Sequence, residues 1–319
     1  MRKERQQITP NILMRLAHLL GTEVKNGRLD IPKEFGKGYC SGFIFNEHIR
    51  ILISNYTLNI DLAIENPDTN IPARMILFKF QNVVPKAVTA MKGKLSRAVP
   101  SVLIATSSMN TDAVIPIDTD TAAINIEVDA EYLNELFDLS EEPLILQSLL
   151  RNSQPLIFEQ MIYPPLQKIV DEIVDEPVDE TFKLFFLRIK AEELICRLLM
   201  ELKKREEKQI YALNIHDIQA IYKVKERLLM DLGIPPVIKE LAASAHVSPS
   251  KLKRLFKQIF GNSIFSYYQE FRMKEAARLL KEENLSVSEV GYQLGFTNLS
   301  HFSRVFKEHI GMKPKQYSR

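Results

Sequence analysis

The chain contains only two cysteines, Cys40 and Cys196, which lie far apart in the sequence. Two isolated cysteines do not make a disulfide scaffold, so we expect reduced thiols and a cytoplasmic protein. The sequence also lacks any run of 18 apolar residues, which argues against a membrane-spanning helix. Its charged start, MRKERQQITP, is not followed by the apolar stretch of a signal peptide. We therefore expect no membrane partner.

Sequence patterns of metal, phosphate and thiol chemistry are missing too. The six histidines are scattered, none is four residues from another, and no Cys-x-x-Cys occurs. These absences argue against a metal site. The segment MKGKLSRAV lacks the first glycine of a phosphate-binding loop and the Ser or Thr after its lysine. No histidine close in sequence would activate Cys40, which favours a buried structural thiol. We expect no catalytic residue and no cofactor.

What the sequence does contain is an uneven distribution of charge. Residues 217–319 hold 17 Lys and Arg against 10 Asp and Glu, whereas the first 216 residues hold 25 against 30. A basic module attached to an acidic body is typical of a polyanion-binding domain. Chance segregation of surface charge is the alternative, and charge alone does not decide between them.

The first two-thirds of the chain predict an α+β domain. NILMRLAHLL, residues 11–20, has the apolar spacing of a short helix, with Pro10 before it and Gly21 after it. Residues 27–128 are rich in Ile, Phe, Tyr and Thr and are interrupted by prolines, which predicts a series of short strands in a sandwich or barrel. AEYLNELF then returns to a helical pattern.

A helical hairpin is expected over residues 155–208. Both IFEQMIYPPLQKIVDEIV and ETFKLFFLRIKAEELICRLLMELKKREE carry apolar residues at helical spacing, and Pro177 separates them. Leu194, Leu198 and Leu202 form one stripe of the second helix. Such a stripe suits a two-fold homodimer interface. The alternative buries it against the preceding helix at Leu166, Ile169 and Ile173 and leaves a monomer.

The C-terminal third contains an internal repeat. RLFKQIFG, residues 254–261, recurs as RVFKEHIG, residues 304–311, and a tyrosine follows each glycine after the same interval. An offset of 49 residues before Thr297 and of 50 after it aligns residues 237–267 with residues 286–317. Identical or similar residues recur throughout this alignment, so we infer a duplicated supersecondary unit.

Each copy predicts a helix-turn-helix motif, the first at about 237–261 and the second at about 286–311. In the first, Ser248 is placed as N-cap, Pro249 as the first helical residue and Gly261 as the C-terminal stop. In the second, Ser286 and Glu289 have the spacing of a capping box, and Asn298 precedes the final helix. Helix, short turn and helix is the arrangement that places one helix in a DNA groove.

The second helix of each copy has one apolar and one polar face. On the first, Ser250, Lys251, Lys253, Arg254 and Lys257 lie opposite the apolar stripe; on the second, Ser300, His301, Arg304 and Lys307 do so. A helix fits the major groove of B-DNA, where basic and amide side chains can read base edges. The roughly 20 helical residues between the copies would span about 30 Å, close to the ~34 Å of one DNA turn. Double-stranded DNA is therefore the expected partner.

The C-terminal sequence resembles the DNA-binding domain of AraC/XylS-family bacterial transcription regulators. The resemblance rests on IKELAASAHVSPSKLKRLFKQIFG, FRMKEAARLL and, above all, VSEVGYQLGFTNLSHFSRVFKEHIGMKPKQYSR, and it covers residues 217–319. Upstream, GRLDIPKEFGKGYCSGFIFNEHIRILISNYTLNIDL followed by LRIKAEELICRLLMEL is similar to the sensor half of a subgroup that includes siderophore-responsive regulators.

This resemblance implies a domain organisation and a set of contacts. It implies a cupin-like β half-barrel and a helical hairpin for effector sensing and dimerisation in residues 1–210, and an all-α DNA-binding domain in residues 215–319. A small-molecule effector, RNA polymerase and activation of transcription are likewise implied by resemblance. The residues that it places on DNA bases are Ser250, Lys253, Arg254, Leu299, Ser300, His301 and Arg304. It places Lys257 and Lys307 on phosphates. Leu299 departs from the family pattern, which is often polar there.

Two alternative functions are compatible with these residues. The N-terminal barrel could catalyse modification of a small molecule beside a DNA-binding domain, or the regulator could be independent of any ligand. A barrel that holds metal needs clustered histidines with a carboxylate, and the β region contains only His48. An architectural DNA-compacting protein is disfavoured, since the whole chain has a net charge of only +2.

Overall fold

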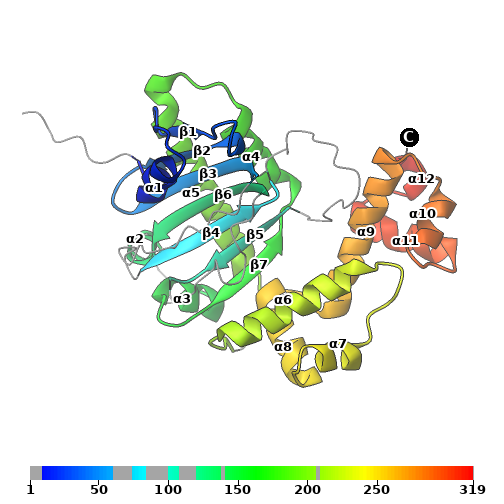
Figure 1. Cartoon of the computed structure of the whole chain (residues 1–319). Coiled ribbons are helices and arrows are strands. Elements are labelled where there is room, and N and C mark those ends of the chain that lie inside the picture. Colours follow the sequence, from blue (N-terminus) through cyan, green and yellow to red (C-terminus); the bar gives the residue numbers. More distant parts are fainter. Residues whose placement is uncertain are drawn as a thin grey trace, which may run out of the picture. The chain divides into compact units, whose positions relative to one another are not determined.

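The computed structural model describes residues 9–59, 74–83, 100–107, 120–137, 141–205 and 209–318. It divides into two compact units, Met1–Leu213 and Asn214–Arg319 (Figure 1). The remaining parts of the predicted β region, 60–73, 84–99 and 108–119, lie outside the described residues, and so do 206–208 of the linker. No helix in the described ranges combines the length and apolarity that crossing a membrane requires.

The first unit contains a seven-stranded antiparallel sheet in the order β1-β2-β3-β6-β4-β5-β7 (Figure 1). The strands are β1 (Arg28–Asp30), β2 (Gly36–Ile44), β3 (Ile49–Leu58), β4 (Met75–Gln81), β5 (Ser101–Ala105), β6 (Asp120–Asp129) and β7 (Ile157–Met161). The first six confirm the expected strand-rich region and the α+β class. Strand β6 lies between β3 and β4, so the sheet is not a simple meander.

One face of the sheet is packed against helices. Alternate strand residues such as Ile51, Phe78 and Ile126 are fully buried, in one cluster with residues of the helices. The helices that contribute to this cluster are α2 (Ala130–Leu136), α3 (Leu144–Arg151), α4 (Pro164–Asp175) and α5 (Glu180–Lys203). Figure 1 shows the long helix α5 crossing the sheet on this side. The period of two along each strand separates this apolar face from the other.

The opposite face has two different parts. At the β1–β3 end, helix α1 (Asn11–Leu19) buries Leu13 and Leu16 in a second cluster with Leu29, Cys40 and Tyr56. Further along the same face, polar residues lie among apolar ones. Lys79 lies in register with Asn125 on one side and with Leu103 on the other, and Leu103 is in register with Glu159. Both Lys79 and Glu159 are buried.

The helical hairpin differs from the prediction at its start. Residues Ile157–Met161, expected to be helical, form strand β7, and the helix begins only at Pro164. Strand β7 pairs with the edge of β5, which supplies its backbone hydrogen bonds. Proline favours the first position of a helix, so Pro164 fixes where α4 starts. The hairpin therefore consists of α4 and α5 rather than of residues 155–208.

The leucines that were predicted to form a dimer interface are buried within the first unit. Leu194, Leu198 and Leu202 have no exposed surface and belong to the same cluster as Leu166 and Ile169. The alternative interpretation, burial against the preceding helix, is therefore correct for these leucines. These three side chains contribute to the core of the first unit.

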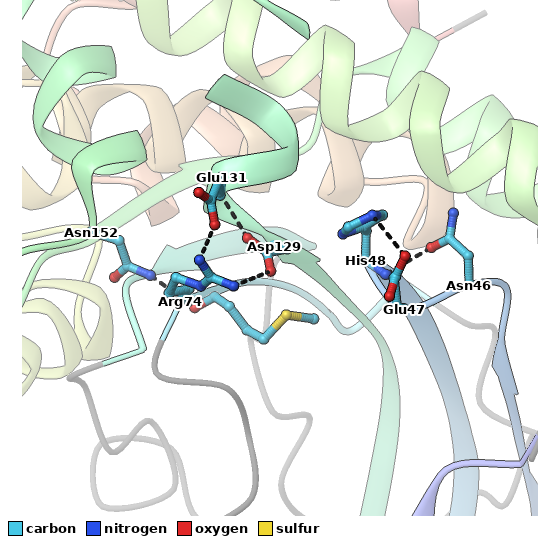
Figure 2. Close-up of polar contacts among 8 residues, drawn as sticks. Asn46, Glu47, His48, Arg74, Asp129, Glu131 and Asn152 are labelled. Atoms are coloured by element: carbon cyan, nitrogen blue, oxygen red, sulfur yellow. Dashed lines mark hydrogen bonds and ion pairs between the residues drawn. The ribbon is translucent and has the colours of Figure 1, made fainter. Parts of the chain in front are cut away.

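Polar contacts attach helices α2 and α3 to one rim of the sheet (Figure 2). Asp129 caps α2 by accepting a hydrogen bond from the backbone N–H of Glu131, at 2.8 Å. Arg74, just before β4, forms ion pairs with both of these carboxylates. At the end of α3, Asn152 donates from Nδ2 to the carbonyl oxygen of Met75, at 3.4 Å. On the same rim Asn46 accepts from the backbone N–H of His48. These contacts are structural, and we assign no chemistry to them.

The second unit is entirely helical in its described residues. It contains α6 (Ile215–Met230), α7 (Ile238–Ser244), α8 (Pro249–Phe260), α9 (Ile264–Glu282), α10 (Val287–Gln293), α11 (Leu299–Ile310) and α12 (Pro314–Tyr317). The pairs α7/α8 and α10/α11 occupy the two copies of the repeat, and the long helix α9 connects them (Figure 1). Helix α9 packs against helices of both pairs and is therefore the central helix of this unit.

Candidate nucleic-acid interface

The first helix pair is shaped by the local signals that the sequence contains. Ser248 caps α8 by accepting a hydrogen bond from the backbone N–H of Lys251, at 3.2 Å, and Pro249 is the first helical residue. Gly261 ends the helix with φ 73°, a left-handed conformation that glycine adopts at little cost. The predicted apolar stripe is buried, and it anchors α8 through Leu252, Leu255, Phe256 and Ile259.

The second pair repeats this construction. Ser286 and Glu289 form a reciprocal capping box at the start of α10, and these hydrogen bonds hold the pKa of Glu289 below its usual value. Asn298 caps α11 through the N–H groups of Ser300 and His301. Gly311 ends α11 at φ 89°. The buried stripe of α11 consists of Phe302, Val305 and Phe306.

The predicted contact residues of α8 share one exposed face. Ser250, Lys253, Arg254 and Lys257 are all exposed. Their spacing of i, i+3, i+4 and i+7 places them on a single side of the helix. Lys251 points elsewhere, since its Nζ lies 2.7 Å from Oδ1 of Asp217 on α6. The structure thus separates one lysine of this helix from the four predicted residues.

On α11 the predicted residues are divided between two environments. Ser300, His301, Arg304 and Lys307 are exposed. Leu299 is only half-exposed, because it packs against α10: a Cβ atom added to Gly291 would lie 2.6 Å from its Cδ2. The four exposed residues form a polar face equivalent to that of α8, with Leu299 at its inner edge.

The electrostatics of the two faces suit an anionic partner. In the described ranges, Lys253, Arg304 and Lys307 have no ion pair within the chain, so their charges are available to a ligand. By contrast, no group of three His, Cys, Asp or Glu side chains that could hold a metal occurs among the described residues. The arrangement can bind phosphates and donate hydrogen bonds to base edges.

The prediction from the sequence did not include helix α6. Asn214 caps it by accepting from the backbone N–H of Asp217, at 2.8 Å, and Ile218, Ile221 and Val224 are buried along one side. The three-residue spacing of these side chains was the available signal. Helix α6 matters for the site because it contacts both α7 and α8 and supplies Asp217 to Lys251.

Comparison with known proteins places this region in a family. A helix-turn-helix domain family matches residues 241–319. The HTH-type transcriptional regulator GlxA of Rhizobium meliloti is 34% identical over 100 residues, which are 31% of this chain and 31% of GlxA. The arabinose operon regulatory protein of Escherichia coli is 35% identical over 80 residues, 25% of this chain and 27% of that protein.

A solved structure is also similar to about a third of this chain. The transcriptional regulator from Chromobacterium violaceum, of the AraC-type DNA-binding domain-containing proteins, is 27% identical; the match covers 33% of this chain and 94% of that chain, with a TM-score of 0.31. This chain matches about a third or less of the length of the two curated relatives. The C-terminal residues 241–319 match a helix-turn-helix domain family, and over this part the chain is similar to AraC-type transcription regulators.

Proposed function

We propose that this chain is a transcription regulator that binds specific DNA sequences through two helix-turn-helix motifs, α7/α8 and α10/α11. The observation that carries the proposal is the equivalence of the two faces. Arg254 and Lys257 on α8 occupy the same repeat positions as Arg304 and Lys307 on α11, and all four are exposed. Two such faces, connected through α9, can read adjacent segments of the major groove on one side of the duplex.

Individual roles follow from side-chain chemistry. Arginine donates two parallel hydrogen bonds to O6 and N7 of guanine, so Arg254 and Arg304 are assigned to base reading. Lys257 and Lys307, about one turn further along their helices, are assigned to phosphates, where a point charge is sufficient. The shorter polar residues Ser250, Ser300 and His301, and also Lys253, complete the base contacts. Leu299, half-covered by α10, can offer only its outer methyl group to a thymine methyl.

The first unit is assigned to effector sensing, with a cupin-like sheet as receiver. Support comes from the polar part of the sheet face that lacks α1. Lys79 and Glu159 are 9% and 2% exposed, which is unusual for charged residues. Asn125 Oδ1 and Gln81 Nε2, on the same face, are buried atoms without a hydrogen-bond partner in the described part of the chain. A polar small molecule could satisfy such groups.

The output of the sensor is activation through RNA polymerase. Effector binding would favour one arrangement of the α4–α5 hairpin and of the linker 206–214, and so change how the second unit is presented. A ligand must bind one arrangement more tightly than the other to have this effect.

A homodimer is assigned to a different surface of α5 from the one expected. Phe182, Phe185 and Ile189 are 64%, 67% and 44% exposed and lie at i, i+3 and i+7 on one side of the helix. Large apolar side chains that recur on one exposed helix face are typical of a protein interface. A second copy of α5 offers the same surface, and two copies would bind repeated DNA sites with higher effective concentration.

Binding of duplex DNA by the two units separately tests the proposal. Fragment Asn214–Arg319 should bind a mixed-sequence duplex at low salt, and its affinity should fall steeply as salt rises, because each phosphate contact releases a counterion. Fragment Met1–Leu213, which lacks both helix pairs, is the control and should not bind. A folded Asn214–Arg319 fragment that fails to bind DNA at low salt would refute the proposed function.

A further inference from the structure

In the second unit the loop between α6 and α7 contacts the turn between α10 and α11. Gly233 lies in the loop between α6 and α7, which leads into the first pair. Gly295 lies in the turn between α10 and α11 and has φ 75°. A Cβ atom at Gly295 would overlap the carbonyl oxygen of Gly233, so the two backbones are in direct contact. Only glycine permits this approach, and the positive φ adds a second requirement for it.

Two buried side chains of α9 donate hydrogen bonds to the backbone on either side of this contact. Tyr268 Oη donates a hydrogen bond to the carbonyl oxygen of Leu232, at 2.7 Å, beside Gly233. Arg272 Nε donates to the carbonyl oxygen of Leu294, at 2.7 Å, beside Gly295, and its Nη2 donates to the same oxygen. The two residues lie one helical turn apart on α9; Tyr268 holds the loop before α7, and Arg272 holds the turn between α10 and α11.

Arg272 is an unexpected residue for such a buried position. The residue is 6% exposed, and its guanidinium lies over the ring of Phe296, at 3.8 Å from the ring centroid. In the described part of the chain it has no carboxylate partner. Burial lowers the pKa of Arg272, because removing the guanidinium from water destabilises its charged form. A leucine at this position could fill the same space but could not donate hydrogen bonds. The hydrogen bonds to the carbonyl oxygen of Leu294 therefore explain why the residue is an arginine.

We propose that Arg272 is a positioning residue that locks the α10/α11 turn against the α6–α7 loop and thereby fixes the distance and rotation between α8 and α11. The inference rests on the proposed function. Helix α9 packs against both pairs, but a single connecting helix can bend or twist. The contact at Gly233 and Gly295, held by Tyr268 and Arg272, adds a second connection and makes the pairs one rigid body.

The consequence for DNA is a strict spacing between two recognised segments. One added base pair moves the second segment by about 3.4 Å and rotates it by about 34°. A rigid pair of helices cannot follow this change, whereas a loosened pair can. Loss of Arg272 should therefore reduce the penalty for wrong spacing, which a residue that only stabilises the fold would not do.

The experiment uses the full chain and the duplex that it selects from a random library. The affinity is measured for that duplex and for versions with one base pair added or removed between the two recognised segments. For the wild type we expect a loss of about 10-fold or more at wrong spacing, the size of a misplaced base contact. Arg272→Gln should bind the selected duplex less tightly and discriminate less than about 3-fold between spacings.

Three further variants make the result decisive. Arg272→Lys keeps the charge but loses the planar guanidinium with its two adjacent donors. This variant should restore part of the discrimination between correct and wrong spacing. Arg278→Gln removes an arginine from the same helix that pairs with Glu275 and Glu283, and should keep the wild-type spacing profile. If Arg272→Gln does not fold, Tyr268→Phe, which loses only the hydroxyl, takes its place and should also relax the profile.

The possible outcomes separate the inference from the proposed function. If folded Arg272→Gln, or Tyr268→Phe in its place, keeps the wild-type ratio between spacings, then the positioning role is wrong while DNA binding stands. If the wild type selects no sequence at all, the proposed function fails and the inference fails with it. A relaxed profile in Arg272→Gln, with an unchanged one in Arg278→Gln, supports the inference.

Discussion

At the residue scale, the two exposed faces distinguish side chains by position along the helix. In the proposed DNA complex, Arg254 and Arg304 face base edges in the major groove, and Lys257 and Lys307 lie about one turn later on the same helices. Base contacts carry sequence information, whereas phosphate contacts supply affinity for any DNA. The two kinds of residue should therefore respond differently to substitution.

Substitution of the arginines should affect specific DNA selectively. Arg254→Gln or Arg304→Gln should cost about 1–3 kcal/mol on a selected site and relax preference at one position. Lys257→Gln or Lys307→Gln should weaken selected and random DNA alike and reduce the salt slope by about one. Fluorescence anisotropy titrations on both duplexes measure this. An equal loss on both duplexes for the arginine variants would make them phosphate contacts.

The two cysteines should differ sharply in reactivity. Burial raises the pKa of the Cys40 thiol to about 12, whereas Cys196 is exposed on α5. At about pH 7.5 fewer than roughly one in ten thousand Cys40 thiols would be ionised. We predict one fast-reacting thiol in the native chain and two after denaturation, measured with a disulfide reagent. Cys196→Ser should abolish the fast phase; two fast thiols in the native wild type would contradict the structure.

At the element scale, α5 carries two stripes with different roles. Its buried leucines belong to the core, while Phe182, Phe185 and Ile189 are exposed. Sequence periodicity indicated that this helix has more apolar surface than one contact needs, but periodicity alone does not say which stripe faces the sheet. That choice depends on the sheet beneath it, which is formed by residues far away in the sequence.

Substitutions on the two stripes should separate assembly from stability. Phe185→Glu should convert the proposed dimer to a monomer with little change in the free energy of unfolding, because the side chain is exposed in the single chain. Leu198→Ala should cost about 2–5 kcal/mol of that free energy through the cavity that it leaves. Light scattering at micromolar concentration and urea denaturation measure the two effects. A wild type that is monomeric at that concentration would eliminate the dimer.

Elements with strong local signals were predictable, and those fixed by distant partners were not. Helices α8 and α11 could be placed from the sequence because an N-cap residue and a terminal glycine agree with the apolar period of each, and α8 also has a proline at N1. Strand β7 could not, since its short apolar run fits either structure and only pairing with β5 decides. The buried leucines of α5 and the contact at Gly233 likewise depend on tertiary packing. For the proposed interface, the sequence also gave no indication that α10 half-covers Leu299.

At the scale of the whole molecule, the chain combines an acidic and a basic unit. The excess of basic residues after Asp217 lies in the same unit as the two helix pairs. The polar sheet face belongs to the other unit. In the proposed function the basic unit binds DNA and the acidic unit binds an effector, and regulation then requires a coupling free energy between the two binding events.

In the proposed function, α8 and α11 read two adjacent segments of one duplex. Selection of bound sequences from a random DNA library tests it most directly, with the wild type, Arg254→Gln and Arg304→Gln compared in parallel. The account predicts two conserved blocks centred about 10 base pairs apart, of which each variant blurs a different one. A single block, or the same block blurred by both variants, would contradict the account.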